Sequence, residues 1–281
     1  MRTLAICHAS KTMLRTAALR AAHHILDKPP IFEDPIAIAL VPASAQAMVA
    51  SLDADLAMLR AAFAVRSRFA EDRLARAAAR NVSQYVMIGP GLDTFPWRQP
   101  DYAHKMRLFS ADHPETLAWT RAYFQGRRLR EPPNLTFLPV DLEECRLGER
   151  LVQSGFDPGA PAFLSALGVT QYVSRTAIDS TLAFAVSLAA GSEIVFSFVL
   201  PADELNGEDA CLAVRAAERA ASLGEPWKTR LRPSDIVRQL EVLGFSEVFH
   251  LTEKAAHDRY FVGRQDDLKT PGFEQTICAI V

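Results

Sequence analysis

The chain has few cysteines, and they do not form the patterns that build metal sites or disulfide frameworks. Its four cysteines are spread over 281 residues, and none lies within CxxC spacing of another: Cys7, Cys145, Cys211 and Cys278. Because structural zinc sites and disulfide scaffolds need closely patterned cysteines, neither is expected here. We therefore predict a fold that carries no metal and rests on its hydrophobic core.

The chain also has no excess of charge of one sign and no long apolar run. It contains 31 basic and 33 acidic residues, with a formal net charge of −2. This balance gives no field that would attract nucleic acid or a membrane surface. No window of about twenty apolar residues is present, as a membrane span would require, and the start "MRTLAICHASKTM" does not read as a signal peptide. We therefore expect a cytoplasmic protein without nucleic-acid or membrane partners.

The first eighty residues have a helical pattern, and the rest of the chain alternates strands with helices. Helices are expected at 10–27, capped by Ser10, at 34–42, opened by Asp34, and at 61–81. Short buried strands are expected at 85–89, 105–112, 135–142, 160–169 and 192–200. Because helical segments separate these strands, the pattern predicts an α/β fold with a doubly wound, mostly parallel sheet.

The domain organisation follows from this change of pattern. We predict an N-terminal helical cap over residues 1–80 and an α/β domain over 81–281, with a helical insertion near 203–230. Segments 247–252, 258–264 and 275–280 are expected to complete the sheet with an antiparallel edge strand.

The first strand ends in "GPGLDT", which points to a ligand lying against the backbone. Glycines leave room there, and ligands of such sheets bind at the carboxyl ends of the strands. The pattern lacks the third glycine of a dinucleotide-binding turn, and Asp93 stands where a pyrophosphate would dock and would repel it. S-adenosylmethionine has no phosphate and carries an amine, so it fits this turn better than a nicotinamide dinucleotide does.

Acidic residues follow the second and third strands. Asp112, in "FSADHP", is placed to accept the hydroxyls of a ribose, 23 residues after Gly89. Asp141, in "VDLEE", is placed to accept from an adenine amine, with Leu142 as an apolar wall. The alternative is that both aspartates only cap the helical turns that follow them.

With these residues in view, the chain resembles the leucine carboxyl methyltransferase-type family of S-adenosylmethionine-dependent enzymes, in particular its bacterial O-methyltransferase branch. Segments that carry the resemblance occur in order along nearly the whole chain: "TAALRAAHHILDKPPIFEDPIA", "VRSRFAEDRL", "GPGLDT", "ADHP", "VDL", "GFDPGAPAFLSALGVTQYV" and "GEPW". The resemblance implies a class I methyltransferase, Rossmann-like sheet with an N-terminal helical lid.

The resemblance also implies roles for single residues. Arg66 would pair with the carboxylate of the cofactor, Gly89 and Gly91 would pass beneath its methionine part, and Asp112 would hold the ribose. Asp141 and Leu142 would hold the adenine. The chain departs from the family at one position: Leu167 stands where the family often has a glutamate near the amino group of the cofactor, and Asp93 or backbone carbonyls would then receive the amine.

The expected reaction is methyl transfer to an oxygen of a small molecule or peptide, most simply a carboxylate, which needs no general base. Arg15 and Arg20 are the candidates to pair with an anionic acceptor, and Tyr172 and Trp227 are the candidates to line its pocket. A phenol or alcohol acceptor would need a general base, for which His23 and His24 are the candidates. Two other readings are a non-catalytic protein that binds S-adenosylmethionine and a nicotinamide-dependent reductase.

Overall fold

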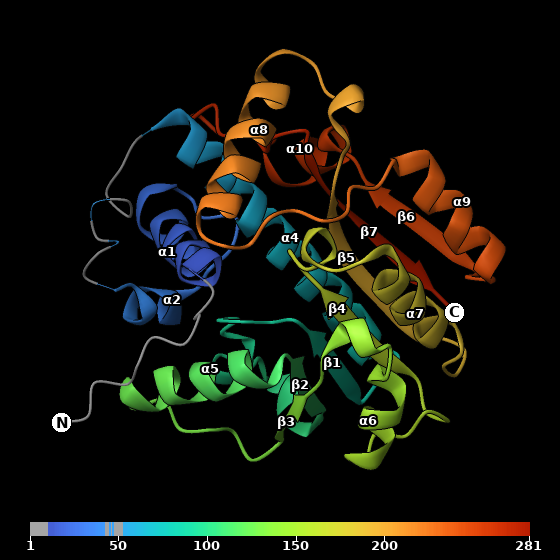
Figure 1. The fold of residues 1–281 in the computed structure, drawn as a ribbon. Helices are drawn as coiled ribbons and strands as arrows, with labels where there is room; N and C mark the ends of the chain where they lie inside the picture. Colours follow the sequence, from blue (N-terminus) through green and yellow to red (C-terminus); the bar gives the residue numbers. More distant parts are fainter. Residues whose placement is uncertain (1–10, 43–44, 46, 48–52) are drawn as a thin grey trace.

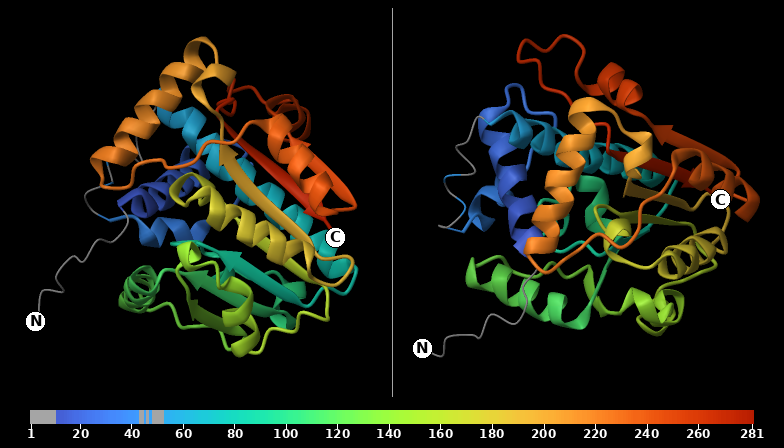
Figure 2. Two further views of the ribbon diagram at one scale, coloured as in Figure 1. Left: turned by 45° about the vertical axis from the view of Figure 1, so that its right-hand side comes forward. Right: turned by 45° about the horizontal axis from the view of Figure 1, so that its top comes forward.

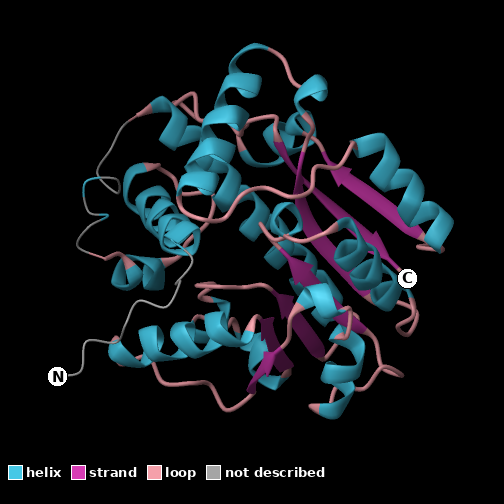
Figure 3. Ribbon diagram, viewed as in Figure 1, coloured by secondary structure: helices cyan, strands magenta, loops and turns pink. Residues whose placement is uncertain are grey.

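A twisted sheet lies at the centre of the computed structural model, which describes residues 11–42, 45, 47 and 53–281 (Figures 1 and 3). In this part of the chain the sheet has seven strands in the order β3-β2-β1-β4-β5-β7-β6. Their bounds are β1 Gln84–Ile88, β2 Arg107–Asp112, β3 Leu135–Pro139, β4 Ala162–Ala166, β5 Glu193–Val199, β6 Glu247–Leu251 and β7 Glu274–Ile280. The predicted α/β class is confirmed.

The first five strands are parallel and the last two add antiparallel pairs, as predicted. β1 pairs with β2 on one side and with β4 on the other, so the strand order reverses at β1. β7 runs antiparallel between β5 and β6. Every residue of β1, β4 and β5 is buried, which is the pattern expected of strands covered on both faces.

Helices cover both faces of the sheet (Figure 3). One core joins the sheet to α6 Leu147–Gln153, α7 Arg175–Val186 and α9 Pro233–Leu243. The other core joins it to α4 Ala54–Ala79 and α10 Glu253–Tyr260. α5 Pro114–Gly126 packs beside β3 at the edge of the sheet. The sheet is therefore doubly wound, and its strand ends stay open between the helical layers.

The N-terminal helices have two different positions. α1 Lys11–Leu26 packs on α2 Pro35–Leu40 and on α4, whereas α4 also lies against β4 and β5. Asp34 caps α2 as predicted, because its carboxylate accepts a hydrogen bond from Ala37 N at 3.0 Å. The predicted cap at Ser10 lies outside the described residues. Of the helices in the predicted 1–80 segment, α4 thus packs directly on the sheet, whereas α1 and α2 form a pair that packs on α4 through α1.

The insertion forms α8 Gly207–Ser222, followed by an irregular segment that leads to α9. Both views of Figure 2 show α8 (orange) standing beside α1 (blue). This arrangement brings segments that are about two hundred residues apart in the sequence to one side of the sheet, where they surround the site described below.

The strand predicted at 258–264 is wrong. This segment contains the last turn of α10 and the turn that follows it. Thr252 caps the start of α10 by accepting from Ala255 N at 3.2 Å. Gly263, at φ +83°, lies in the turn that follows the helix. The aromatic residues that suggested a strand instead anchor the helix end, since Phe261 is buried in the core beneath α4.

Candidate functional site

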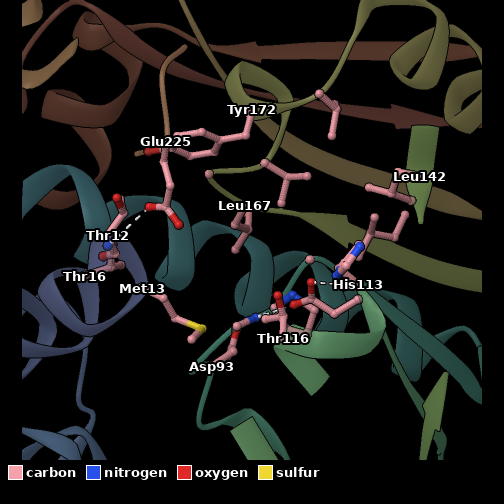
Figure 4. Close-up of a pocket in the computed structure, with 18 of the residues that line it drawn as sticks. Thr12, Met13, Thr16, Asp93, His113, Thr116, Leu142, Leu167, Tyr172 and Glu225 are labelled. Carbon is pink, nitrogen blue, oxygen red and sulfur yellow. Dashed lines mark hydrogen bonds between the residues drawn. The ribbon is translucent and has the colours of Figure 1, made fainter. Parts of the chain in front are cut away.

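A cavity of about 520 Å³ opens at the carboxyl ends of β1, β2 and β4, where the strand order reverses. This is the position at which open α/β sheets bind their ligands, and the volume is in the usual range for small-molecule sites. Figure 4 shows Thr12, Met13 and Thr16 of α1 together with Glu225 on one side of the cavity and Leu142 with His113 on the other. All eight residues predicted to contact the cofactor line it: Arg66, Gly89, Gly91, Asp93, Asp112, Asp141, Leu142 and Leu167.

The turn after β1 has a backbone that requires glycine. Gly89 and Gly91 have φ angles of +59° and +54°, in the left-handed region that other residues rarely adopt. A Cβ on Gly89 would lie 2.6 Å from Val169 Cγ2, and one on Gly91 would lie 2.6 Å from Met13 Sδ. The turn therefore presents bare backbone to the cavity, as the sequence pattern predicts.

Asp112 links this turn to the end of β2. Its Oδ2 accepts from Gly91 N at 3.1 Å and its Oδ1 accepts from His113 N at 2.8 Å. Burial raises the pKa of Asp112 to about 6, although the two backbone hydrogen bonds oppose the shift. The residue is not the cap of α5, which begins after His113, so the carboxylate keeps acceptor positions for a ligand in the cavity.

Asp141 has the capping role that was the alternative for it, and it also lines the cavity. Its Oδ1 accepts from Glu143 N at 2.9 Å and so caps the short 3-10 helix η4 Leu142–Glu144. One carboxylate oxygen is thus used by the backbone, and the side chain still borders the cavity beside Leu142.

Arg66 is buried at the boundary of two cavities and is already paired. It is 8% exposed, and its Nη1 donates to Glu274 Oε1 at 2.5 Å. Its guanidinium lies 4.4 Å from the ring centre of Phe63, and a Cβ on Gly168 would come within 2.8 Å of it. Gly168, at φ +72°, therefore permits this close approach. The pair with Glu274 leaves donors of the planar guanidinium for a carboxylate in the cavity.

A buried ionic network connects the turn after β1 to α1, α2 and α4. Arg98 forms a bidentate pair with Glu71 and lies 3.9 Å from Asp93 Oδ1 and 3.8 Å from Asp34 Oδ1. Arg20 donates to Asp34 Oδ2 at 3.1 Å and to the carbonyl oxygen of Leu92. Arg20 thus borders the cavity with its charge engaged by Asp34, so it holds the turn in place.

The segment after α8 closes the cavity opposite the sheet. Glu225 Oε2 accepts from Thr12 N at 3.3 Å, next to the start of α1. Lys228 Nζ donates to Glu143 Oε1 at 3.0 Å, and Glu143 also accepts from Ser174 N at 3.0 Å. These contacts link α1, η4, α7 and the segment 224–228 around the mouth of the cavity.

A second cavity, of about 450 Å³, adjoins the first. The two share Thr12, Thr16, Arg66, Gly168 and Tyr172, and the second extends between α1, α4 and α8. Trp227 lines the second cavity, and burial raises the pKa of the Tyr172 hydroxyl at the boundary. The structure thus brings Arg15, Tyr172 and Trp227 together here.

The structure does not bring His23 or His24 to either cavity. His23 is fully buried: its Nε2 accepts from Ile31 N at 2.9 Å, and its Nδ1 lies 2.7 Å from Asp27 Oδ2. Since Nε2 accepts, the ring proton is on Nδ1 and is donated to Asp27. Both ring nitrogens are used, so His23 joins α1 to the following loop and has no free nitrogen to act as a base.

Several lining residues were not found by sequence reasoning: Met13, Thr116, Glu143, Gln171, Arg219, Glu225 and Lys228. They come from helices and irregular segments whose position relative to the sheet depends on tertiary packing. Glu143, Gln171 and Glu225 lie in the segments "VDLEE", "GFDPGAPAFLSALGVTQYV" and "GEPW", but no local pattern marks these positions within them.

In the described part of the chain, no group of three or more His, Cys, Asp or Glu side chains is arranged to hold a metal ion. Among the described helices, none combines the length and apolar character that crossing a membrane would require.

Comparison with known proteins agrees with this geometry. The chain is 31% identical over 207 residues to the Bacillus subtilis (strain 168) protein named "Putative S-adenosyl-L-methionine-dependent methyltransferase YktD", covering 72% of this chain and 67% of that one. A Frankia alni protein with the same description is 29% identical over 255 residues, covering 87% and 85%.

Solved structures show the same fold. A DUF574 family protein from Streptomyces avermitilis matches with a TM-score of 0.58 and 15% identity over 94% of this chain and 96% of that one. A protein from Thermobifida fusca also has a TM-score of 0.58, with 18% identity over 94% and 93% of the two chains. The family model described as "Leucine carboxyl methyltransferase" matches residues 13–186, which include α1, the glycine turn and the strands through β4. The chain therefore belongs to the leucine carboxyl methyltransferase family.

Proposed function

We propose that this protein transfers the methyl group of S-adenosyl-L-methionine to an oxygen of a small molecule or peptide, and that this oxygen belongs to a carboxylate. The chain is a methyltransferase of its family, with S-adenosyl-L-methionine as the cofactor. The observation that carries the proposal is the position of Asp112, whose carboxylate is held by the glycine turn and borders the cavity at the switch point of the sheet.

The residues of the first cavity fit this cofactor, which supplies an electrophilic methyl group on a sulfonium. Asp112 would accept the ribose hydroxyls, while Asp141 and Leu142 would border the adenine. The bare backbone of Gly89 and Gly91 leaves room for the methionine part, whose carboxylate Arg66 would bind.

Other carboxylates of the cavity are available to bind the amino group of the cofactor in place of the family glutamate. Leu167 offers no charge, but Asp93 and Glu225 border the same cavity. In Figure 4, Leu167 lies between the Glu225 and Asp93 sides of the cavity. We propose that one of these two carboxylates takes the ammonium.

A carboxylate acceptor suits the second cavity because such an acceptor is ionised at neutral pH and needs no general base. Histidine does not occur among the described residues that line this cavity, whereas four arginines do: Arg15, Arg66, Arg215 and Arg219. The chain's own contribution is then to hold the two reactants in line and to exclude water. Such positioning accounts for up to about 7–11 kcal/mol of a barrier.

The test is a calorimetric titration of the purified protein with S-adenosylmethionine and with S-adenosylhomocysteine, beside Asp112→Ala and the control Asp179→Ala. Asp179 is on α7 and pairs with Arg175 away from the cavity. Binding by the wild type and the control that Asp112→Ala loses supports the cofactor site. A panel of carboxylic acids, alcohols and phenols, with release of S-adenosylhomocysteine as the readout, then tests the acceptor class.

Two results would contradict the proposal. Binding of a reduced nicotinamide dinucleotide in place of S-adenosylmethionine would favour a reductase. Tight S-adenosylmethionine binding with turnover of alcohols alone, and of no carboxylic acid, would keep the cofactor and overturn the acceptor class.

A further inference from the structure

We propose that the second cavity is the acceptor site and that it selects an amphipathic carboxylic acid, with its carboxylate bound between Arg15 and Arg219 and its apolar body between α1, α4 and α8. The inference rests on the proposed function, because it assigns the substrate class of that reaction. It is carried by the shape, the charge and the unsatisfied polar atoms of the cavity.

The position and shape suit an acceptor. The cavity shares a wall with the first one at Thr12, Thr16 and Tyr172, so a molecule inside it reaches the place where the two cavities meet. Its volume of about 450 Å³ is that of a site for a small organic molecule. Most of its wall is apolar, with contributions from Leu56, Leu59, Phe63, Leu212, Ala216, Ala220, Leu223, Trp227 and Phe273.

The described residues that line the cavity carry one more positive than negative charge. Its described lining holds four arginines and three carboxylates. Two of these arginines are used in pairs, Arg66 with Glu274 and Arg215 with Asp55 at 2.7 Å.

The remaining two arginines, Arg15 and Arg219, both line the cavity and repel each other. Neither Arg15 nor Arg219 has a carboxylate within 4 Å in the described structure, and Asp53 is the nearby charge that favours Arg15. Burial and the repulsion from Arg219 lower the pKa of Arg15. A ligand carboxylate between the two guanidinium groups would relieve this repulsion and form charge-assisted hydrogen bonds.

Unsatisfied polar atoms point to a ligand independently of the charges. Gln171 is 6% exposed, and its buried Oε1 has no hydrogen-bond partner, like the buried Oγ1 of Thr12. Both residues line this cavity. The backbone of Gln171 is fixed, since its carbonyl oxygen accepts from Lys228 N at 2.7 Å. Buried acceptors without partners are rare in folded proteins, so these atoms are suited to hydrogen bonds with a bound molecule.

The reaction that follows is balanced without a proton. A lone pair on the acceptor carboxylate forms the new O–C bond to the methyl carbon, and the S–C electron pair returns to sulfur. The products are a neutral ester and a neutral thioether. Thr12 and Thr16, on either side of Arg15 in the sequence of α1, border both cavities, so the proposal places the bound carboxylate toward the boundary with the first cavity. Because methylation removes the charge held by the arginines, the ester product binds more weakly than the acid.

The experiment uses 8-anilinonaphthalene-1-sulfonate, which has an apolar body and one anionic group, as a fluorescent probe of the protein saturated with S-adenosylhomocysteine. Its neutral counterpart is N-phenyl-1-naphthylamine. The variants are Arg15→Met, Arg219→Met and the blocking substitution Ala216→Trp. The matched control is Arg76→Met, which removes an exposed arginine from the last turn of α4.

We expect one probe molecule per chain, an affinity about tenfold lower in each of Arg15→Met and Arg219→Met, and loss of binding in Ala216→Trp. The neutral counterpart should bind about tenfold more weakly than the sulfonate, and Arg76→Met should match the wild type. The proposal fails if the probe does not bind, if the variants bind it like the control, or if the neutral compound binds as tightly.

Calorimetry with S-adenosylhomocysteine on the same variants separates the two proposals. Unchanged cofactor affinity with unchanged probe binding would overturn the acceptor site and leave the proposed function standing. Failure of the wild type to bind S-adenosylhomocysteine would overturn the proposed function itself.

Discussion

At the scale of single residues, Asp112 makes cofactor binding depend on pH. Burial raises its pKa to about 6, so about a tenth of the molecules keep the carboxylate ionised at pH 5. Because only the ionised form accepts both ribose hydroxyls, the Kd for S-adenosylhomocysteine should rise about tenfold from pH 7.5 to pH 5. Calorimetry across this range checks it. In Asp112→Asn the affinity should be low and nearly independent of pH, and an equal slope in both proteins would contradict the assignment.

Gly168 permits the close approach of Arg66, and its substitution should weaken cofactor binding beyond the effect of backbone strain. A side chain at this left-handed position costs about 1–2 kcal/mol of folding free energy in any case. Gly191 is the control, because it has φ +85° and nothing within 4 Å of an added Cβ. Urea unfolding should show a similar loss for Gly168→Ala and Gly191→Ala. Only Gly168→Ala should raise the Kd for S-adenosylhomocysteine, and equal Kd values would refute a role for Arg66.

The candidate residues whose place at the cavity is best predicted from the sequence are those that follow the end of a strand. "GPGLDT" and Asp112 are placed by the end of a strand, which the buried runs predict well. His23 is different, because a histidine on a helix has the same sequence signature whether it faces a cavity or a loop. Its partners, Asp27 and the backbone of Ile31, are set by how the chain turns after α1.

At the scale of elements, Asp34 connects α1 and α2 to the turn after β1 and should stabilise the packing of these two helices. It is fully buried, caps α2, and faces Arg20 and Arg98. Asp34→Ala leaves two buried arginines without this partner, so the free energy of unfolding should fall by about 3–5 kcal/mol in urea at pH 7. The control Asp258→Ala removes an exposed partner of Lys254 and should change little.

The pH dependence of this contribution has a defined sign. Burial alone would raise the pKa of Asp34, but Arg20 and Arg98 hold it below its usual value. A carboxyl whose pKa is depressed in the folded state contributes fully above its unfolded pKa and loses its contribution as pH falls through the folded value. The difference in unfolding free energy between the wild type and Asp34→Ala should therefore be constant from pH 5 to 8 and shrink below about pH 4. A difference that shrinks already at pH 6 would contradict the pairing.

The type of an element was predictable where the periodicity of its apolar residues agrees with their burial in the fold, and less predictable where the two conflict. Strands β1, β4 and β5 are mostly apolar and buried throughout, and α4 begins at a clear cap, Asp53, although earlier than its strongest pattern suggested. The strand predicted at 258–264 is wrong because the aromatic residues of this segment favour a strand when the segment is considered alone. Arg15, Tyr172 and Trp227 of the second cavity were named from the sequence, but most of its wall was not predictable, since α8 and α1 meet only through tertiary packing.

At the scale of the whole molecule, the first cavity is lined by α1, by the ends of the sheet strands and by the segment after α8, so a ligand there should stabilise all three together. Its lining includes Thr12 of α1, Asp112 after β2 and Glu225. S-adenosylhomocysteine at a hundred times its Kd adds about 2.7 kcal/mol to the free energy of unfolding. For a chain of this size we expect a Tm higher by about 5 °C in a thermal unfolding scan.

The variants show whether this stabilisation passes through the proposed site. Asp112→Ala should lose the rise in Tm, because it lacks the acceptor for the ribose. Arg219→Met should keep the whole rise, since Arg219 lines the second cavity and not the first. A rise that persists in Asp112→Ala would place the ligand elsewhere on the molecule. A rise that is lost in Arg219→Met would mean that the two cavities act as one site, with acceptor residues already needed to hold the cofactor.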